Sequence, residues 1–251
     1  MNKLSKIFAA AVLAGAACLP SAQAAGVVQL GFILDESGSI GATNYNTIKT
    51  GLANAINTLV PVGGLYEVTV VSFASSATTL VNHMLISTAA DRTTAANLVL
   101  ADSFSAGTTA MDAAFNTMKA DLLASTQSIS ATYVNFATDG VPNNQALATA
   151  ARNSLITAAG VDNLSVEAIG AGVDAAYLKT QICYPAPCDD TAPYNFPTQG
   201  FYIPVADAAG YAAAIGPKIR VVTGQVPEPG SLALVGLALA GVAGLGRKQR
   251  A

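Results

Sequence analysis

The strongest constraint on the fold is an alternation of apolar segments with segments of helical periodicity. The segment VVQLGFIL at 27–34 is continuously apolar, as expected of a strand covered on both faces. Further strands are expected at 66–74, 132–138, 164–172 and 200–205, and helices at 43–59, 89–100, 109–124, 143–160 and around 207–216. This alternation favours an α/β fold, doubly wound, with a mostly parallel central sheet flanked by helices. The strand at 66–74 is the candidate for an antiparallel edge.

The two ends of the chain differ from this body, which we expect to form one domain over residues 25–222. Lys3 and Lys6 precede the apolar run IFAAAVLAGAACL, and Ala22-Gln23-Ala24 forms a small-residue cleavage site. These are the features of a secretory signal peptide over residues 1–24. A lipoprotein signal with an acylated Cys18 is the alternative, but Gly15 stands where such signals have a large aliphatic residue.

Export would place the two remaining cysteines in an oxidising compartment. Cys183 and Cys188 lie in CYPAPC, and no second group of Cys or His residues lies near them in the sequence. A metal site built on this pair is therefore disfavoured. We expect Cys183 and Cys188 to form a short disulfide loop.

The C-terminal end consists of a proline motif, an apolar segment and a basic terminus. Val226, Pro227, Glu228 and Pro229 precede sixteen uncharged residues at 231–246, and three of the last five residues are basic. A helix of that length would span about 24 Å, which is short of a hydrocarbon core of about 30 Å. On these residues alone the segment would be a marginal membrane anchor, its basic end facing the cytoplasm.

Polar residues follow the predicted strands at the points where ligands of open α/β sheets bind. Five of them supply two carboxylates and three hydroxyls, namely Asp35, Ser37, Ser39, Thr108 and Asp139. Such oxygens suit a hard divalent cation such as Mg²⁺, and an open coordination position would accept a carboxylate from a partner. Gly38 would allow Ser37 and Ser39 to face the ion together, whereas Glu36 is expected to point away.

These segments resemble the motifs of von Willebrand factor type A domains. DESGS is similar to the DxSxS signature, AGTTAMDAAF to the Gly-Thr loop and FATDGVPN to the Asp-Gly segment, although Ala106 stands where many members have Gly. The resemblance covers about residues 26–220. It implies a Rossmann-like fold and a metal-ion-dependent adhesion site for Mg²⁺, Mn²⁺ or Ca²⁺. The ligands carried over by position are Asp35, Ser37, Ser39, Thr108 and Asp139.

The C-terminal residues 223–251 closely resemble the PEP-CTERM sorting signals of Gram-negative bacteria, with Val226-Pro227-Glu228-Pro229 as the motif. The resemblance implies recognition by an exosortase in the inner membrane, removal of the tail, and release to the cell surface or extracellular matrix. Membrane contact is then expected only through the short transmembrane helix before processing.

The expected function is binding, not catalysis. We expect a cell-surface or matrix adhesion protein that binds a carboxylate of a protein or an acidic polysaccharide. The alternative is a structural matrix protein whose metal only stabilises the fold. Residues 25–226 contain 14 Asp and Glu and 7 Lys and Arg residues, a net charge of −7, which disfavours nucleic acid as a partner.

Enzyme motifs are poorly matched. A haloacid-dehalogenase-like phosphatase, the remote alternative, needs a second Asp where Ser37 stands. A serine hydrolase would have to use His83, the only histidine, without a G-x-S-x-G segment. The chain also has no phosphate loop of the G-x-x-x-x-G-K type.

Overall fold

The computed structural model describes residues 26–186, 188, 190 and 195–225. The predicted signal peptide at 1–24, the sorting motif Val226-Pro227-Glu228-Pro229 and the predicted transmembrane helix at 231–246 lie outside these residues. Within the ranges that are described, no helix is both long enough and apolar enough to cross a membrane.

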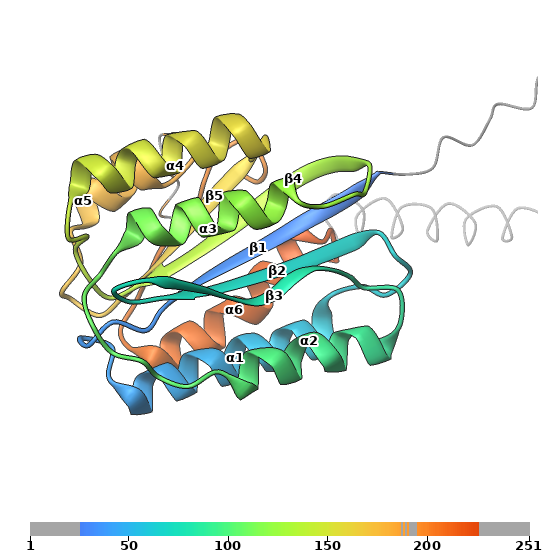
Figure 1. Cartoon of the computed structure of the whole chain (residues 1–251), viewed down its shortest axis with the longest axis horizontal. Coiled ribbons are helices and arrows are strands. Elements are labelled where there is room, and N and C mark those ends of the chain that lie inside the picture. The colour runs from blue at the N-terminus through green and yellow to red at the C-terminus, as the bar shows by residue number, and fades with distance from the viewer. Residues whose placement is uncertain (1–25, 187, 189, 191–194, 226–251) are drawn as a thin grey trace, which may run out of the picture.

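A six-stranded sheet forms the centre of the fold, in the order β3-β2-β1-β4-β5-β6 (Figure 1). The strands are β1 Val27–Asp35, β2 Tyr66–Phe73, β3 Ala77–Leu85, β4 Ile129–Thr138, β5 Asn163–Ile169 and β6 Tyr202–Val205. Every neighbouring pair is parallel except β2 and β3. The prediction of a mostly parallel, doubly wound α/β sheet is therefore confirmed.

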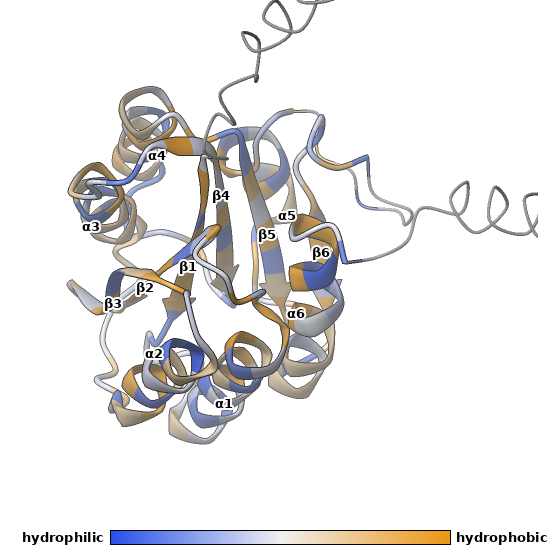
Figure 2. Cartoon of the chain, turned by 90° about the vertical axis from the view of Figure 1, so that its right-hand side faces the viewer, coloured by the Kyte–Doolittle hydropathy of each residue, from blue (hydrophilic) through white to orange (hydrophobic). Residues whose placement is uncertain are grey.

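Helices cover both faces of the sheet. One layer contains α1 Ala42–Leu59, α2 Ala89–Ala101 and α6 Ala208–Val222; the other contains α3 Met111–Leu123, α4 Gln145–Ala159, the short α5 Ala175–Tyr177 and the π-helix η1 Leu178–Ile182 (Figure 1). Each layer buries its own apolar cluster against the sheet, with Leu52 and Tyr211 in one and Phe115 and Phe136 in the other. Figure 2 shows the two layers on opposite sides of the sheet, whose strands carry both hydrophobic and hydrophilic residues.

The structure differs from the sequence pattern at one edge of the sheet and at the end of α6. The pattern does not predict β3, because most of its residues are only partly buried and no continuous apolar run marks it. β3, and not the segment at 66–74, is the antiparallel edge, and β2 lies inside the sheet. At the other end of the chain, α6 continues through Pro217 to Val222 because Lys218 and Ile219 are buried against the sheet.

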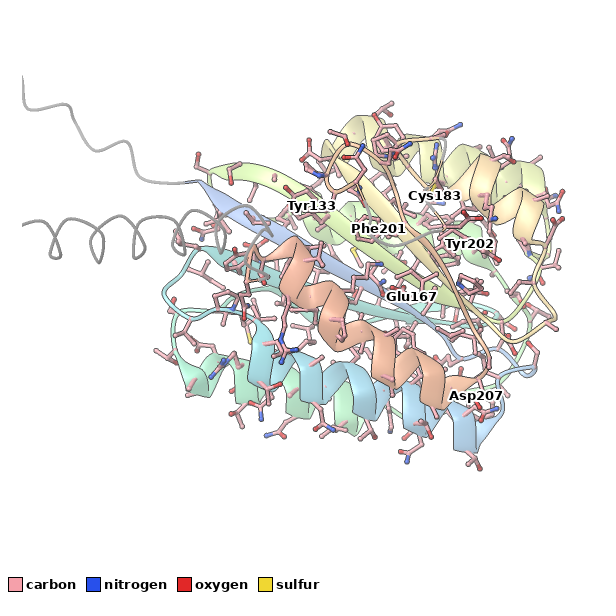
Figure 3. All side chains as sticks on the ribbon, turned by 180° about the vertical axis from the view of Figure 1, so that it is seen from behind. Tyr133, Glu167, Cys183, Phe201, Tyr202 and Asp207 are labelled. Carbon is pink, nitrogen blue, oxygen red and sulfur yellow. A yellow bond between two sulfur atoms is a disulfide. The ribbon has the colours of Figure 1, made fainter. Side chains whose placement is uncertain are left out.

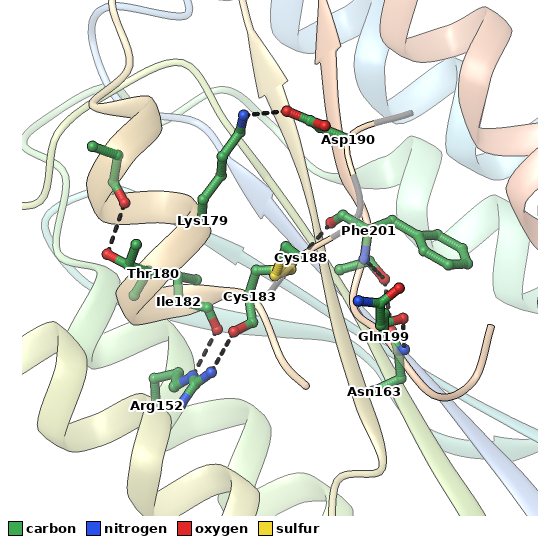
Figure 4. Close-up of a disulfide and its surroundings, with 12 residues drawn as sticks. Arg152, Asn163, Lys179, Thr180, Ile182, Cys183, Cys188, Asp190, Gln199 and Phe201 are labelled. Carbon is green, nitrogen blue, oxygen red and sulfur yellow. Dashed lines mark hydrogen bonds and ion pairs between the residues drawn. A yellow bond between two sulfur atoms is a disulfide. The ribbon is translucent and has the colours of Figure 1, made fainter. Parts of the chain in front are cut away.

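The segment between β5 and β6 contains a local disulfide and is tied to α4 by an arginine (Figure 4). Cys183 and Cys188 form a disulfide bond. The guanidinium of Arg152, on α4, donates hydrogen bonds to the carbonyl oxygens of Ile182 and Cys183. Because Cys183 is fully buried, the loop is anchored at this end, next to the start of β6.

A buried ion pair joins α6 to the sheet. Lys218 Nζ lies 2.7 Å from Glu167 Oε1, and both side chains are almost completely buried. Glu167, labelled in Figure 3, also accepts a hydrogen bond from Asn135 of β4. Burial lowers the pKa of Lys218, and the neighbouring Glu167 carboxylate offsets part of that effect. Each charge therefore depends on the other for its compensation.

Replacing one member of this pair should destabilise the domain strongly. Lys218→Met leaves the Glu167 carboxylate buried without its counter-charge, and we expect a loss of about 3–5 kcal/mol in the free energy of unfolding. The paired change Lys218→Met with Glu167→Leu removes both charges and should recover most of that loss. Urea denaturation of the three proteins measures this. A single variant as stable as the wild type would contradict it.

Candidate metal centre

The centre begins where β1 and β4 end side by side. Asp35, the last residue of β1, is 1% exposed. Its Oδ1 accepts a hydrogen bond of 2.8 Å from the Ser37 backbone N–H, and its Oδ2 accepts one of 2.6 Å from Thr138 Oγ1, at the end of β4. The Thr138 hydroxyl in turn accepts a bond of 3.1 Å from the N–H of Gly140. Both oxygens of Asp35 are thus fixed by neighbouring residues.

The predicted hydroxyls extend this group toward solvent. Ser37 Oγ lies 3.1 Å from Ser39 Oγ, and Ser39 Oγ donates a bond of 2.8 Å to Asp139 Oδ1. Ser37 is buried, Ser39 is exposed and Asp139 is partly exposed. The structure therefore places four of the five predicted ligands in one hydrogen-bonded group with a buried floor and an open side.

Gly38 holds the turn of residues 35–39 against the loop that carries Thr108. Its N–H donates a bond of 2.9 Å to the carbonyl oxygen of Gly107. A Cβ at Gly38 would lie 3.3 Å from that oxygen, and the φ of Gly38 is not positive. The glycine therefore suits the close approach of two loops, and it is not required by a left-handed turn.

Thr108, the fifth predicted ligand, is exposed beside this group. Its hydroxyl accepts a bond of 2.8 Å from Asn143 Nδ2 and lies 3.2 Å from Ser75 Oγ, while its N–H donates to Ser75 Oγ at 3.0 Å. Within the described residues, no hydrogen bond joins Thr108 directly to the other four predicted ligands. The hydrogen bond from Gly38 to Gly107 is one of the contacts that hold the two parts together.

Three residues that orient the predicted ligands were not predicted from the sequence: Ser75, Thr138 and Asn143. Asn143 and Thr138 lie within the segment FATDGVPN, so that motif carried a signal for both. Ser75 lies in the turn between β2 and β3, and the sequence pattern gives no signal for that turn because it does not predict β3.

Glu36 points away from the hydroxyls and into the protein. It is 4% exposed, and its Oε2 accepts a bond of 2.9 Å from the backbone N–H of Ser105. Burial raises the pKa of Glu36, the Ser105 bond opposes that change, and the nearby Asp102 adds to it. Glu36 therefore contacts the loop that carries Thr108.

The two acidic residues of the centre are destabilised as anions by their surroundings. Burial raises the pKa of Asp35 from 3.8 to about 6, although hydrogen bonds from Ser37 and Thr138 lower it. Asp139 adds a small further increase by repulsion. Burial also raises the pKa of Asp139, against the hydrogen bond from Ser39. A cation between these groups would relieve both the desolvation and the repulsion.

The donors fit a hard divalent cation. All five are oxygens, and two of them are carboxylates that together balance a charge of +2. No cluster of three or more His, Cys, Asp or Glu residues suitable for a metal occurs in the part of the chain that the structure describes. Hydroxyls thus supply the remaining donors. Such a set can hold a cation while leaving a position for an outside oxygen ligand.

Two family models match the chain. A family model for the von Willebrand factor type A domain matches residues 29–191, and one for the PEP-CTERM protein-sorting motif matches residues 225–248. No curated protein sequence matches the chain significantly. The matched sorting motif indicates export and recognition by an exosortase.

Among solved structures, manganese-loaded TRAP protein of Plasmodium vivax is similar, with 26% identity, a TM-score of 0.57, and 77% of this chain and 74% of that chain covered. Proximal thread matrix protein 1 of the mussel byssus, with zinc in its MIDAS motif, has 15% identity and a TM-score of 0.61, over 79% of this chain and 48% of that one. The pilus adhesin SpaC of Lactobacillus rhamnosus GG has 14% identity and a TM-score of 0.59, with 80% of this chain and 31% of that chain covered. The chain thus spans about half of the byssus protein and less of the adhesin.

Cation binding at this centre should depend on pH near 6. Because the pKa of Asp35 is raised to about 6, a proton competes with the cation below that pH. We expect the affinity for Mg²⁺ to be about tenfold weaker at pH 5 than at pH 7.5, measured by calorimetry.

Mg²⁺ affinity should rise with pH, but the same pKa shift predicts that the stability of the metal-free domain falls as the pH rises. The folded state holds the Asp35 proton more tightly than the unfolded chain, so stability in EDTA should fall as the pH rises from 3.8 to about 6. Melting curves in EDTA across this range provide the control.

An Mg²⁺ affinity that does not change between pH 5 and pH 7.5 would contradict the assignment of Asp35 as a ligand.

Proposed function

Because the chain belongs to the von Willebrand factor type A family, we propose that it is a non-enzymatic binding protein that holds a partner through a divalent cation. The hydrogen-bonded group of Asp35, Ser37, Ser39 and Asp139 is the main support for this proposal. It gathers residues from the ends of two strands into an oxygen-rich floor, with Thr108 beside it.

We propose Mg²⁺ as the cation, with Mn²⁺ or Ca²⁺ as substitutes, since hard cations prefer oxygen donors. Asp35, Ser37, Ser39, Thr108 and Asp139 would hold it, directly or through water. Bound there, the cation supplies an electrophilic centre for one further oxygen ligand. Ser75 and Asn143 orient Thr108, and Thr138 orients Asp35.

The proposed partner presents a carboxylate, either on a protein or on an acidic polysaccharide. The exported body has a net charge of −7 and should repel polyanions at long range, so the cation must supply the local attraction. An adhesive role at the cell surface, or in an extracellular matrix or biofilm, is in line with the fold shared with a byssus matrix protein and a pilus adhesin. The alternative, a structural protein whose metal only stabilises the fold, is an outcome of the test below.

Residues 1–24 are proposed as the signal peptide, 25–222 as the binding domain, and 223–251 as the sorting signal with its short transmembrane helix. In this proposal an exosortase acts on the tail at the inner membrane, and the domain passes to the cell surface or matrix. The route is that of a Gram-negative bacterium.

Partner binding should require the cation and Thr108. We expect the wild type to capture a component of the producing cell's matrix with Mg²⁺, to lose it in EDTA, and to keep it in moderate salt because coordination is short-ranged. Asp35→Asn and Thr108→Ala should each weaken Mg²⁺ binding by at least about tenfold, or 1.4 kcal/mol, and abolish capture.

The matched control is Thr94→Ala, on the exposed side of α2, where Thr94 bonds only to its own helix. This variant should bind Mg²⁺ and the matrix component as the wild type does. Glu36→Ala is unsuitable as a control because Glu36 contacts the loop of Thr108. Capture that persists in EDTA, or with a folded Thr108→Ala protein, would favour the purely structural role.

The C-terminal tail should be a sorting signal that is removed during export. We expect the extracellular protein to lack residues from near Pro227 onward. Replacing Pro227, Glu228 and Pro229 by alanine should hold the protein in the inner membrane. Mass spectrometry of the extracellular form and fractionation of the variant test this. Finding residues 247–251 on the extracellular protein would instead indicate a permanent anchor.

A further inference from the structure

The loop that carries Thr108 has an unfavourable backbone. This loop, residues 102–110, joins α2 to α3 and is called the Thr108 loop here. Ala106 has φ +58° and Gly107 has φ +123°, so two consecutive residues are in the left-handed region. Ala106 has a Cβ and disfavours that conformation. The position of Thr108 directly after this pair must therefore be imposed by contacts outside the loop.

Contacts on both sides of the left-handed pair impose this conformation. After it, the Thr108 N–H donates to Ser75 Oγ, and the Gly107 carbonyl oxygen accepts from Gly38. Immediately before it, the Ser105 N–H donates to Glu36 Oε2 at 2.9 Å. Glu36 is therefore the side chain that fixes the residue preceding Ala106.

The start of the loop is held by α1. Tyr45, on α1, donates a hydrogen bond from its hydroxyl to the Asp102 carboxylate, and its ring packs on Phe104 at 6.0 Å between centroids. Lys49 Nζ donates to the carbonyl oxygen of Leu100 at 3.1 Å, just before the loop. These contacts fix residues 100–104. The segment from Ser105 onward is held instead by Glu36 and by the contacts of Gly107 and Thr108.

Glu36 links the two parts of the proposed centre. It lies between Asp35 and Ser37 in the sequence, while its buried carboxylate bonds to the Thr108 loop. We propose that Glu36 is a positioning residue: its carboxylate oxygen holds the Thr108 loop in the conformation that binds the cation. This inference rests on the proposed function, because it takes Thr108 as a ligand.

The test compares Glu36→Met, which removes the acceptor at similar volume, with Glu36→Gln, which keeps an oxygen that can accept from Ser105. The full-length protein, kept in solution with mild detergent, is titrated with Mg²⁺ by calorimetry. We expect about a tenfold loss of affinity for Glu36→Met, as for residues that orient metal ligands, and less than about a twofold change for Glu36→Gln. In EDTA, the amide hydrogen of Ser105 should exchange faster in Glu36→Met only.

Glu67→Met is the matched control for the loss of a buried carboxylate. Glu67 is 2% exposed and bonds to Gln29 and Ser125. It lies six residues before Phe73, which pairs with Asp35, and so is about 20 Å from the centre along the strand. This variant should be less stable than the wild type but should bind Mg²⁺ equally well.

The outcomes separate this inference from the proposed function. If the wild type binds no Mg²⁺, the proposed function fails, whereas unchanged Ser105 exchange in Glu36→Met would overturn the positioning role by itself. Wild-type Mg²⁺ affinity in Glu36→Met, or an equal loss in Glu36→Gln, would also overturn it. If Glu36→Met does not fold, Glu36→Asp, whose shorter side chain cannot reach Ser105, must show the same tenfold loss.

Discussion

The parallel pairing of β1 with β4 is the interaction on which the candidate centre depends. Leu34 is paired with Ala137, so Asp35 ends its strand beside Thr138, and Asp139 follows immediately. A shift of one residue would exchange the faces of the strand and remove the Thr138 hydroxyl from Asp35. The register is held by apolar residues such as Ile33 and Phe136, which pair with each other two residues before Asp35 and Thr138 and are fully buried in the layer beneath α3 and α4. The packing of apolar residues within the sheet thus determines where the polar residues at the ends of β1 and β4 lie.

That placement has an electrostatic cost in the metal-free protein. Asp35 is buried, its pKa is raised, and Asp139 approaches it through Ser39. The hydroxyls of Ser37 and Ser39 add no charge of their own, so the centre holds two negative charges and not four or five. Two carboxylates would balance the charge of a divalent cation without exceeding it, so an open coordination position could still accept a carboxylate from outside. A site with more acidic residues would bind the cation more strongly and the partner less.

The sequence predicted the interior of the fold better than the edge that β3 forms. The continuous apolar run of β1 marks a strand buried on both faces, and Gly160, with φ +63°, ends α4 where expected. β3 lies at an edge and has mixed polarity, so periodicity does not distinguish it from a loop. The candidate ligands were predictable because they form motifs. Ser75 was not predictable, because a single serine in a turn shows no motif. Its role is visible only once the structure places that turn against the Thr108 loop.

Two features depart from local preference at the same place: Glu36 is a buried carboxylate and Ala106 is a left-handed alanine. Of the other three buried carboxylates, Asp35 is a proposed ligand, and the remaining two have structural explanations. Glu167 is paired with Lys218, and Glu67 is bonded to Gln29 and Ser125. Within the residues that the structure describes, Glu36 forms no ion pair with a lysine or arginine, and its carboxylate accepts a hydrogen bond from the backbone N–H of Ser105, one residue before Ala106. Folded proteins usually depart from the conformational and burial preferences of their residues at functional sites. Glu36 contacts the loop of Thr108 one residue before Ala106, so the two departures meet at one hydrogen bond, and we infer that they serve the geometry of this loop.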